Sequence, residues 1–310
     1  MRLLSETYAS ETRDGAAIWA DESRFAASGP ADLVSGKPTD AALGINHYMK
    51  VDPRSFAMPT YADGVAAITA EIEAAGTDVD RECLDYVLRR RAGSSDVVFA
   101  NGARKRDCNA AGELLERRRD GAGLGVVFDD FVNHPNSRIA HLQAPHVLAL
   151  RLYSTAAYAS LNNPLRDTRP DRPPHPFPVT INYIKEAIGQ LRAVAEQGAK
   201  DDSLDLWRGL KNLRAADGFL QQGGTELAPM STTTDLSVAV AYSMSTASLL
   251  FKIRTTSFMQ RGADLAYLSA FPGEAETLFP PLTYLRPTGR TLELAHRGVT
   301  VTVIEVEPTQ

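Results

Sequence analysis

Cysteine is scarce in this sequence, which holds only Cys83 and Cys108 among its 310 residues. Two isolated thiols are too few for a disulfide framework or a four-thiolate metal site. They are typical of a protein from a reducing compartment, although a single bridge between them stays open. The sequence therefore excludes the small proteins that disulfides or structural zinc hold together.

Long apolar runs are also missing. Nowhere do eighteen apolar residues follow one another, so we expect no membrane span. Near the N-terminus, Leu3 and Leu4 form the only apolar pair before an acid at Glu6, which is unlike the apolar segment of a secretory signal. We expect a cytoplasmic protein by default, while export by a non-classical route, or the earlier removal of a leader, stays open.

Positive charge is not in excess, since the formal net charge is −5 and the sequence pI is about 5.7. Such a chain has no surplus of cations to neutralise a phosphate backbone over a wide surface, so we expect no nucleic acid as main partner. Apolar residues make up 44% and charged residues 23%, as in an ordinary globular protein. The length allows one large domain or two smaller ones with a substantial core.

The sequence lacks a recognisable metal motif. His134, His141 and His146 lie close together, but their spacing matches no familiar pattern of ligands, so we expect no metal. The glycine-rich segments Asn101-Gly102 and Gly121–Gly125 lack the strand-to-helix context of a dinucleotide-binding fingerprint. We interpret both as turns.

A cluster of Asn, His and Pro at Asn133–Ser137 predicts a boundary between two regions. Residues 1–135 are predicted to form a mostly helical N-terminal region of unknown role, and its first part, to about residue 45, is expected to be a loosely ordered lead-in. Apolar positions at helical spacing predict two helices in this region, at Tyr61–Ala75 and around Cys83–Val87. After a short apolar stretch at Val97–Phe99 and a turn signal, a third helix is predicted at Asn109–Arg119, where a cluster of arginines ends it.

Residues 136–310 are predicted to form an α+β domain, because helical patterns come first and strand patterns follow. We expect helices at His146–Leu161 and Asn182–Gln197, with Asn163-Pro164 interrupting the first and a stiff proline-rich connector at 170–178 between them. Alternating or short apolar runs then predict strands: Leu204–Leu210, Leu249–Arg254, Leu265–Leu268, Thr277–Leu285 and Val299–Val306.

Two carboxylates, Glu274 and Glu276, stand in the segment Phe271–Pro281, where a turn signal leads into an apolar strand. In an extended chain, residues two apart project to the same side, about 6–7 Å apart along the strand. We therefore expect the two acids to face one cleft. Taken alone the Glu-x-Glu pattern is weak, because alternating acids also occur on solvated strands.

Two upstream segments give this pattern its context. Arg208 lies in Leu206–Leu210, and Ser231 opens a Ser-Thr-Thr run that ends at Thr233. The order Arg, then Ser-Thr-Thr, then Glu-x-Glu resembles the R-S-E class of mono-ADP-ribosyltransferases, which includes clostridial binary toxins and vertebrate arginine-specific ecto-enzymes. The helical stretch Leu150–Arg166 resembles the Tyr-rich helix that opens this domain, and the likeness covers about residues 138–308.

The resemblance implies an α+β fold with two packed mixed sheets preceded by helices, and a reaction in which NAD loses nicotinamide through a ribosyl cation. It implies that Glu276 stabilises this cation, as a carboxylate does in glycoside hydrolysis. Arg208 is expected to bind a pyrophosphate oxygen, and Gly209 to let the backbone approach the nicotinamide carboxamide. Ser231 and Thr232 are expected to hydrogen-bond the nicotinamide ribose and the catalytic carboxylate.

The acceptor is also implied by the resemblance. A Glu at the first position of the motif accompanies arginine acceptors in the family, so Glu274 predicts a protein acceptor with an exposed arginine. Four further residues are carried over as contributors to NAD binding: Tyr153, Tyr158, Asn162 and Arg166.

Two alternatives stay open. The first is an NAD glycohydrolase on the same fold, in which water replaces the acceptor. The second is a catalytically inactive binding module. The retention of Arg208, Ser231 and Glu276 argues against the second.

Overall fold

The computed structural model describes residues 43–89, 127–167, 169–196 and 203–309, apart from positions 214, 216, 246, 258, 259, 272, 273 and 297. The lead-in, the stretch Val97–Phe99, the helix expected at Asn109–Arg119 and the two glycine-rich segments lie outside this part.

The chain divides into two compact units. One, here the helical unit, consists of Asn46–Val194 and Asp264–Glu274, and the other, here the sheet unit, includes Ala195–Ala263 and Ala275–Gln310. The helical unit extends across residue 135, and the boundary proposed there stays a prediction.

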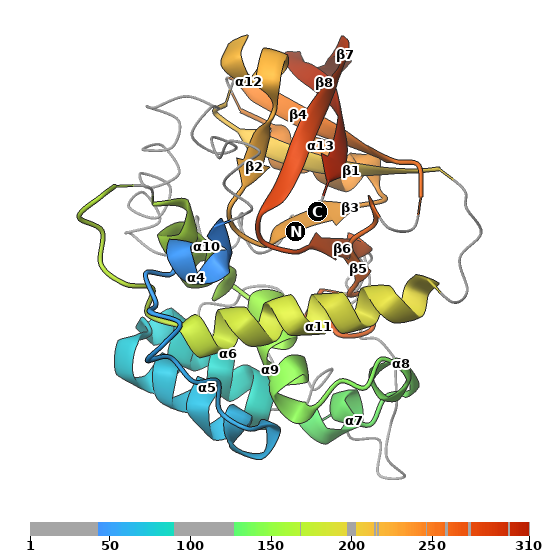
Figure 1. Cartoon of the computed structure of the whole chain (residues 1–310). Coiled ribbons are helices and arrows are strands. Elements are labelled where there is room, and N and C mark those ends of the chain that lie inside the picture. Colours follow the sequence, from blue (N-terminus) through green and yellow to red (C-terminus); the bar gives the residue numbers. More distant parts are fainter. Residues whose placement is uncertain are drawn as a thin grey trace. The chain divides into compact units, whose positions relative to one another are not determined.

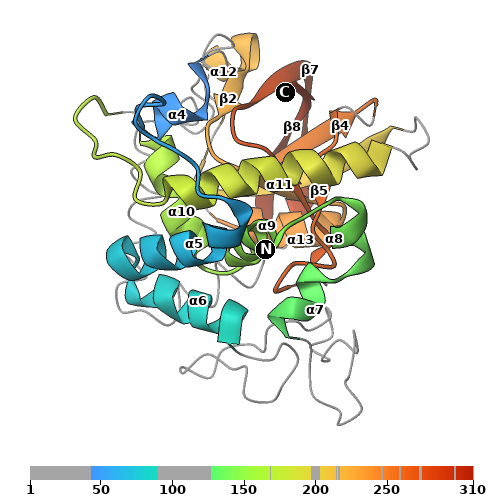
Figure 2. The same ribbon diagram turned by 60° about the horizontal axis from the view of Figure 1, so that its bottom comes forward.

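The helical unit is built around one buried helix. This helix, α9, buries every residue from Pro145 to Tyr153, which is typical of a helix enclosed on all sides. Helices α5, α6 and α7 contact it, and Figure 2 shows α5 and α6 side by side. The helices of this part are α4 (Ile45–Tyr48), α5 (Tyr61–Ala75), α6 (Asp78–Arg89), α7 (Phe128–Val132), α8 (Pro135–Ile139), α9 (Ala144–Tyr153), α10 (Tyr158–Arg166) and α11 (Pro178–Glu196).

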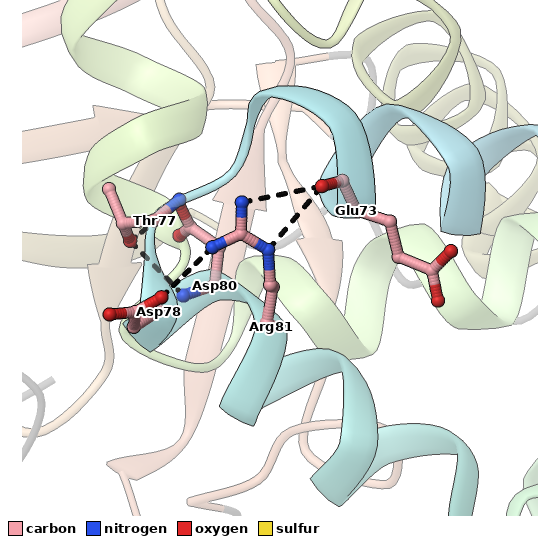
Figure 3. A network of polar contacts seen from close by, with 5 residues as sticks. All are labelled: Glu73, Thr77, Asp78, Asp80 and Arg81. Carbon is pink, nitrogen blue, oxygen red and sulfur yellow. Dashed lines mark hydrogen bonds and ion pairs between the residues drawn. The ribbon is translucent and has the colours of Figure 1, made fainter.

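A polar network fixes the turn between α5 and α6 (Figure 3). The backbone N–H and the hydroxyl of Thr77 each donate to Asp80 at 2.8 Å, and the N–H of Asp80 donates back to the Thr77 hydroxyl at 3.2 Å. Arg81 pairs with Asp78 at 2.9 Å and donates to the carbonyl of Glu73. Side chains thus satisfy two N–H groups at the start of α6, those of Thr77 and Asp80, and one carbonyl near the end of α5, that of Glu73.

The single helix expected at His146–Leu161 is wrong, because α9 ends at Tyr153 and α10 begins at Tyr158. The hydroxyls of Ser154 and Thr155 donate to carbonyls three residues back, at 2.8 and 2.6 Å, and compete with the helical backbone bonds there. Pro164 does not end the helix but lies inside α10, near its C-terminus. At that place the missing N–H removes one backbone hydrogen bond only.

The sheet unit contains a mixed sheet that joins all eight described strands in the order β2-β7-β8-β4-β1-β3-β6-β5 (Figure 1). Strand β4 pairs with β8 in parallel, and the other recorded pairs are antiparallel. The strands are β1 (Leu204–Lys211), β2 (Gly224–Glu226), β3 (Met230–Thr233), β4 (Ser248–Thr255), β5 (Ala263–Asp264), β6 (Glu276–Phe279), β7 (Thr283–His296) and β8 (Val299–Thr309), with helices α12 (Asp217–Gln222) and α13 (Leu236–Ser243).

The α+β class is confirmed, and the two expected sheets are joined into one. Strands β1 and β3 meet at a single residue pair, Trp207 with Thr233. On one side of this junction lie β2, β7, β8, β4 and β1, and on the other lie β3, β6 and β5. Because only this one residue pair joins the two groups of strands, the same eight strands can be described as two sheets or as one continuous sheet.

Two predicted strands are corrected. Leu265–Leu268 is a turn, because the N–H groups of Leu268 and Ser269 both donate to the carbonyl of Leu265, at 2.9 and 2.7 Å. Thr277–Leu285 is not one strand but the end of β6 and the start of β7. Pro280 and Pro281 lack N–H groups for the ladder, and Leu282 has a φ of 69°.

The remaining strand predictions are confirmed within a few residues, as is the helix Tyr61–Ala75. Helix α13 begins at Leu236, and the Asp235 side chain caps it by accepting a hydrogen bond from the N–H of Ser237 at 2.8 Å. Ala239 and Val240 of this helix pack on Leu250 and Val301 of the sheet. Helix α13 thus covers one face of the sheet.

No helix in the described part of the chain is long and apolar enough to cross a lipid bilayer.

Candidate active site

Arg208 lies in the middle of β1 with a mostly buried side chain, whose exposed fraction is 11%. Its Nη1 donates to the backbone carbonyl of Ser231 at 2.8 Å, so the guanidinium of β1 reaches the neighbouring strand β3. Its Nη2 lies 3.8 Å from a carboxylate oxygen of Glu226, which is 2% exposed. The cation is therefore held in place by a neutral acceptor and a buried acid.

Glu226 was not predicted as a site residue. It ends β2, and its carboxylate also accepts from the N–H of Ala228 at 3.1 Å. A buried carboxylate is costly unless it is paired and hydrogen-bonded, and Arg208 supplies the opposite charge here. The only signal in the sequence was an acid after two glycines, Gly223-Gly224, in the segment that precedes Ser231.

Gly209 is required by helix packing. A Cβ built on this residue would lie 2.1 Å from the carbonyl oxygen of Ala239 and 2.8 Å from the N–H nitrogen of Ser243, both on α13. Any side chain would therefore force α13 away from β1. The approach of the Gly209 backbone to nicotinamide stays a prediction.

Ser231 and Glu276 lie on adjacent antiparallel strands. Thr233 of β3 is directly opposite Glu276 of β6, and Ser231 is opposite Leu278. Directly opposed residues, and residues two apart on one strand, project to the same face, so Ser231, Thr233 and Glu276 share a face. The Glu276 side chain is 5% exposed.

Thr232 projects to the opposite face from Ser231. Its hydroxyl donates to the backbone carbonyl of Thr277 at 2.8 Å, and its side chain is fully buried. This bond ties β3 to β6 beside the Ser231 and Glu276 positions. The geometry gives Thr232 a part in fixing the two strands, while direct binding of NAD by this residue stays a prediction.

The expectation that Glu274 and Glu276 project from one extended strand is wrong. Strand β6 begins only at Glu276, and Ala275 has a φ of 46°, in the left-handed region. Glu274 stands in a turn, where its N–H donates to the carbonyl of Phe271 at 3.0 Å. The left-handed residue changes the chain direction between the two acids, so the period-two rule does not apply.

The four residues carried over from the helical stretch lie in α9 and α10. The side-chain amide of Asn162 donates to the hydroxyl of Tyr153 at 3.2 Å, and both residues are buried. Tyr158 and Asn162 are one turn apart on α10, as predicted, and Arg166 ends that helix with an exposed fraction of 8%. The structure thus brings Tyr153 and Asn162 into direct contact.

No group of three or more His, Cys, Asp or Glu side chains in the described residues could hold a metal ion. His134 stacks on Tyr267 with ring centroids 4.5 Å apart. His146 accepts from the N–H of Gln143 and faces Glu186 at 3.3 Å. These two histidines serve separate local structures.

Arg208, Ser231 and Glu276 therefore come from three neighbouring strands of the sheet unit, β1, β3 and β6. A fixed guanidinium suits a phosphate oxygen, a small hydroxyl suits a ribose, and a carboxylate suits a developing positive charge. These donors and acceptors fit a dinucleotide with a glycosidic bond to break, and none of this chemistry requires a metal.

Residues 127–305 match the model of a protein family described as NAD:arginine ADP-ribosyltransferase. This match spans more than half of the chain and places the protein in the class of transferases that use NAD as substrate. The chain belongs to the NAD:arginine ADP-ribosyltransferase family. As a member of this family it uses NAD as the donor of ADP-ribose.

Solved structures that are similar to this chain include three bacterial proteins, none of them close in sequence. The ADP-ribosyltransferase toxin Plx2a from Paenibacillus larvae is 15% identical, with a TM-score of 0.44 over 59% of this chain and 95% of that one. The ADP-ribosyltransferase HopU1 of Pseudomonas syringae is 18% identical, with a TM-score of 0.43 over 61% and 91%. The enzymatic component of the C2 toxin from Clostridium botulinum is 18% identical, with a TM-score of 0.43 over 58% and 47%. A search of curated protein sequences gives no match.

Proposed function

We propose that this protein transfers ADP-ribose from NAD to the side chain of an exposed arginine on an acceptor protein and releases nicotinamide. One observation carries the proposal: Arg208, Ser231 and Glu276 stand on three neighbouring strands, and the Arg208 guanidinium donates to the Ser231 carbonyl at 2.8 Å. The family membership supplies the donor, and the Glu at position 274 supplies the choice of arginine.

NAD binding is assigned to two sets of residues. Arg208 binds a pyrophosphate oxygen, because its planar cation is preorganised by the Ser231 carbonyl and by Glu226. Ser231 hydrogen-bonds the nicotinamide ribose, with Gly209 and Thr232 beside these two residues. The second set consists of four residues of α9 and α10 that are proposed as further NAD contacts: Tyr153, Tyr158, Asn162 and Arg166.

The chemical step breaks the bond between the ribose C1′ atom and the nicotinamide nitrogen. The electron pair of that bond leaves with nicotinamide, and positive charge develops on the ribose, where the Glu276 carboxylate stabilises it. A nitrogen of the acceptor guanidinium then forms the new bond to C1′. Glu274 orients this guanidinium, whose pKa is above about 12, and takes its proton as the bond forms.

The test compares two substitutions within the Glu-x-Glu motif. Glu276→Gln should abolish both nicotinamide release and transfer, because it removes the charge that stabilises the ribosyl cation. Glu274→Gln should keep much of the hydrolysis of NAD by water, which releases nicotinamide, and should abolish transfer to arginine. Both reactions are measured with NAD labelled in the adenosine part, by chromatography of nicotinamide and by counting label on an arginine-containing protein.

A matched control is Glu305→Gln. Glu305 is 6% exposed, close to the values of Glu274 and Glu276, but it lies on β8 and pairs with Lys252 at 3.3 Å. This variant should keep both activities, and circular dichroism should show that all three variants fold. Equal loss of release and transfer in Glu274→Gln and Glu276→Gln would contradict the division of roles.

A wild-type protein that releases nicotinamide without labelling any acceptor would instead be an NAD glycohydrolase. A wild-type protein that does neither would be an inactive binding module. Both results would refute the proposed transfer.

A further inference from the structure

The segment that leads to Glu274 belongs to the helical unit and is buried. We call Leu265–Phe271 the anchored segment. Leu268 and Ala270 are fully buried and Ser269 is 1% exposed, although the segment contains only turns and irregular backbone. Irregular segments usually run over the surface, because buried N–H and C=O groups need partners. The anchored segment must therefore find its partners in neighbouring elements.

Arg151 of the central helix α9 supplies one of them. Its Nη1 donates to the backbone carbonyl of Leu268 at 2.7 Å, and the residue is 1% exposed. Its guanidinium carbon lies 3.8 Å from the centre of the Phe131 ring, in a cation–π contact. A buried cation is expensive unless such contacts hold it, so this donor has little freedom to move.

Ser154 supplies a second partner, one turn further along the chain. Its hydroxyl accepts from the N–H of Ala270 at 2.9 Å and donates to the carbonyl of Arg151 at 2.8 Å. The same residue thus ends α9 and holds the anchored segment. Within the segment, the hydroxyl of Ser269 accepts from the N–H of Phe271 at 3.0 Å.

Tyr267 holds the segment from a third direction. Its ring stacks on His134 with centroids 4.5 Å apart, and its hydroxyl lies 3.2 Å from that of Ser137. Burial raises the pKa of Tyr267 to about 12, so the hydroxyl keeps its proton and remains a donor. Side chains of α8 and α9, together with the residues that cap them, therefore fix the segment at Tyr267, Leu268 and Ala270.

The residues fixed by these contacts, Leu268 and Ala270, are only a few positions before Glu274 in the chain. Phe271 ends the anchored segment, and its carbonyl accepts from the N–H of Glu274 at 3.0 Å. The backbone of the anchored segment thus sets the position at which the turn with Glu274 starts. A shift of Leu268 or Ala270 would be passed on to that carboxylate.

We propose that Arg151 and Ser154 are positioning residues for the acceptor step, because they fix the backbone that places Glu274. This inference rests on the proposed role of Glu274. Neither residue is assigned a contact with NAD or with the acceptor. They act by holding a carboxylate in the geometry in which it orients the incoming guanidinium, and small errors in such geometry reduce rates strongly.

The test uses Ser154→Ala with its neighbour Thr155→Val as the matched control. Thr155 is also fully buried, and its hydroxyl donates to the carbonyl of Leu152 at 2.6 Å and accepts from the N–H of Ala157 at 3.3 Å. Both variants remove a buried hydroxyl from the same helix end. Of the two hydroxyls, that of Ser154 bonds to the anchored segment.

Each variant is assayed with NAD and agmatine, a small guanidine, by measuring nicotinamide release into water and the ADP-ribosylated agmatine formed. For Ser154→Ala, the ratio of transfer to hydrolysis should fall about tenfold and the KM for agmatine should rise, while the KM for NAD stays unchanged. Thr155→Val should keep the wild-type ratio. A merely structural role would lower both activities together and leave the ratio unchanged.

Arg151→Lys and Arg151→Met give an independent arm. Lysine keeps a cationic donor for the Leu268 carbonyl and should retain more of the ratio than methionine, which has none. Equal ratios for wild type, Ser154→Ala and Thr155→Val would overturn the inference while leaving the proposed function intact. A wild-type protein that never modifies agmatine or protein arginine would refute the proposed function, and this inference with it.

Discussion

The buried histidine His175 should make the stability of the helical unit depend on pH. Its Nδ1 accepts from the N–H of Phe177 at 2.9 Å, so the proton of the neutral ring sits on Nε2, which lies 3.0 Å from the Leu161 carbonyl. The residue is 5% exposed. Burial lowers the pKa of His175 from 6.5 to about 4, against a raising effect of the Leu161 carbonyl.

The sign of the effect follows from this lowered pKa. As the pH falls below 6.5, the unfolded chain takes up a proton that the folded chain refuses until about pH 4. The contribution of His175 is therefore complete above pH 6.5 and is lost on going down to about pH 4. At 1.36 kcal/mol per pH unit the full loss is at most about 3.4 kcal/mol, and at about pH 5 it is roughly 2 kcal/mol.

The assay is urea unfolding followed by far-UV circular dichroism, at about pH 7.5 and about pH 5. His175→Asn keeps an acceptor near the Phe177 N–H but has no group that titrates in this range. Between the two pH values the wild type should lose roughly 2 kcal/mol more than this variant. His296→Asn, which removes an exposed imidazole, serves as control and should behave as the wild type. Equal pH dependence of the wild type and His175→Asn would show that the His175 imidazole does not cause the loss of stability.

Three further predictions concern Gly209, Glu226 and Ala275 of the sheet unit. Gly209→Ala should destabilise the protein by about 1–3 kcal/mol, since its Cβ would lie 2.1 Å from the Ala239 carbonyl oxygen, and thermal unfolding measures this. Glu226→Gln should cost about 3 kcal/mol, because it leaves the Arg208 cation without its buried carboxylate, and an unchanged urea midpoint would argue against that pairing. Ala275→Val should lower stability by about 1–2 kcal/mol and reduce arginine transfer, whereas Ala275→Gly, which adopts a φ of 46° freely, should do neither.

The sequence predicted the elements whose signal is local. Helix α5 has its apolar residues at regular spacing and a Thr60 cap, and its bounds were predicted to the residue. Strands β1, β4 and β8 are short apolar or alternating runs. The order of Arg208, Ser231 and Glu276 along the chain was visible because each stands in a short recognisable segment.

The parts that could not be predicted depend on distant partners. The buried turn at Leu265–Leu268 looks like a strand by its apolar residues, and Arg151, more than a hundred residues earlier in the chain, satisfies its backbone. The pairing of Glu226 with Arg208 needs a register that no local pattern specifies. Ala275 adopts a left-handed conformation although it is not a glycine, so the sequence shows no sign of the turn there. The geometry of the Glu-x-Glu motif was therefore predicted wrongly.

We propose that Arg208, Ser231 and Glu276 act together in the transfer of ADP-ribose from NAD to arginine. The most direct measurement is mass spectrometry of an acceptor protein incubated with NAD and either the wild-type protein or Glu276→Gln, with fragmentation that locates the modified side chain. We expect ADP-ribose on arginine with the wild type and no modification with Glu276→Gln. Modification of another residue type, or unchanged arginine modification by Glu276→Gln, would contradict it.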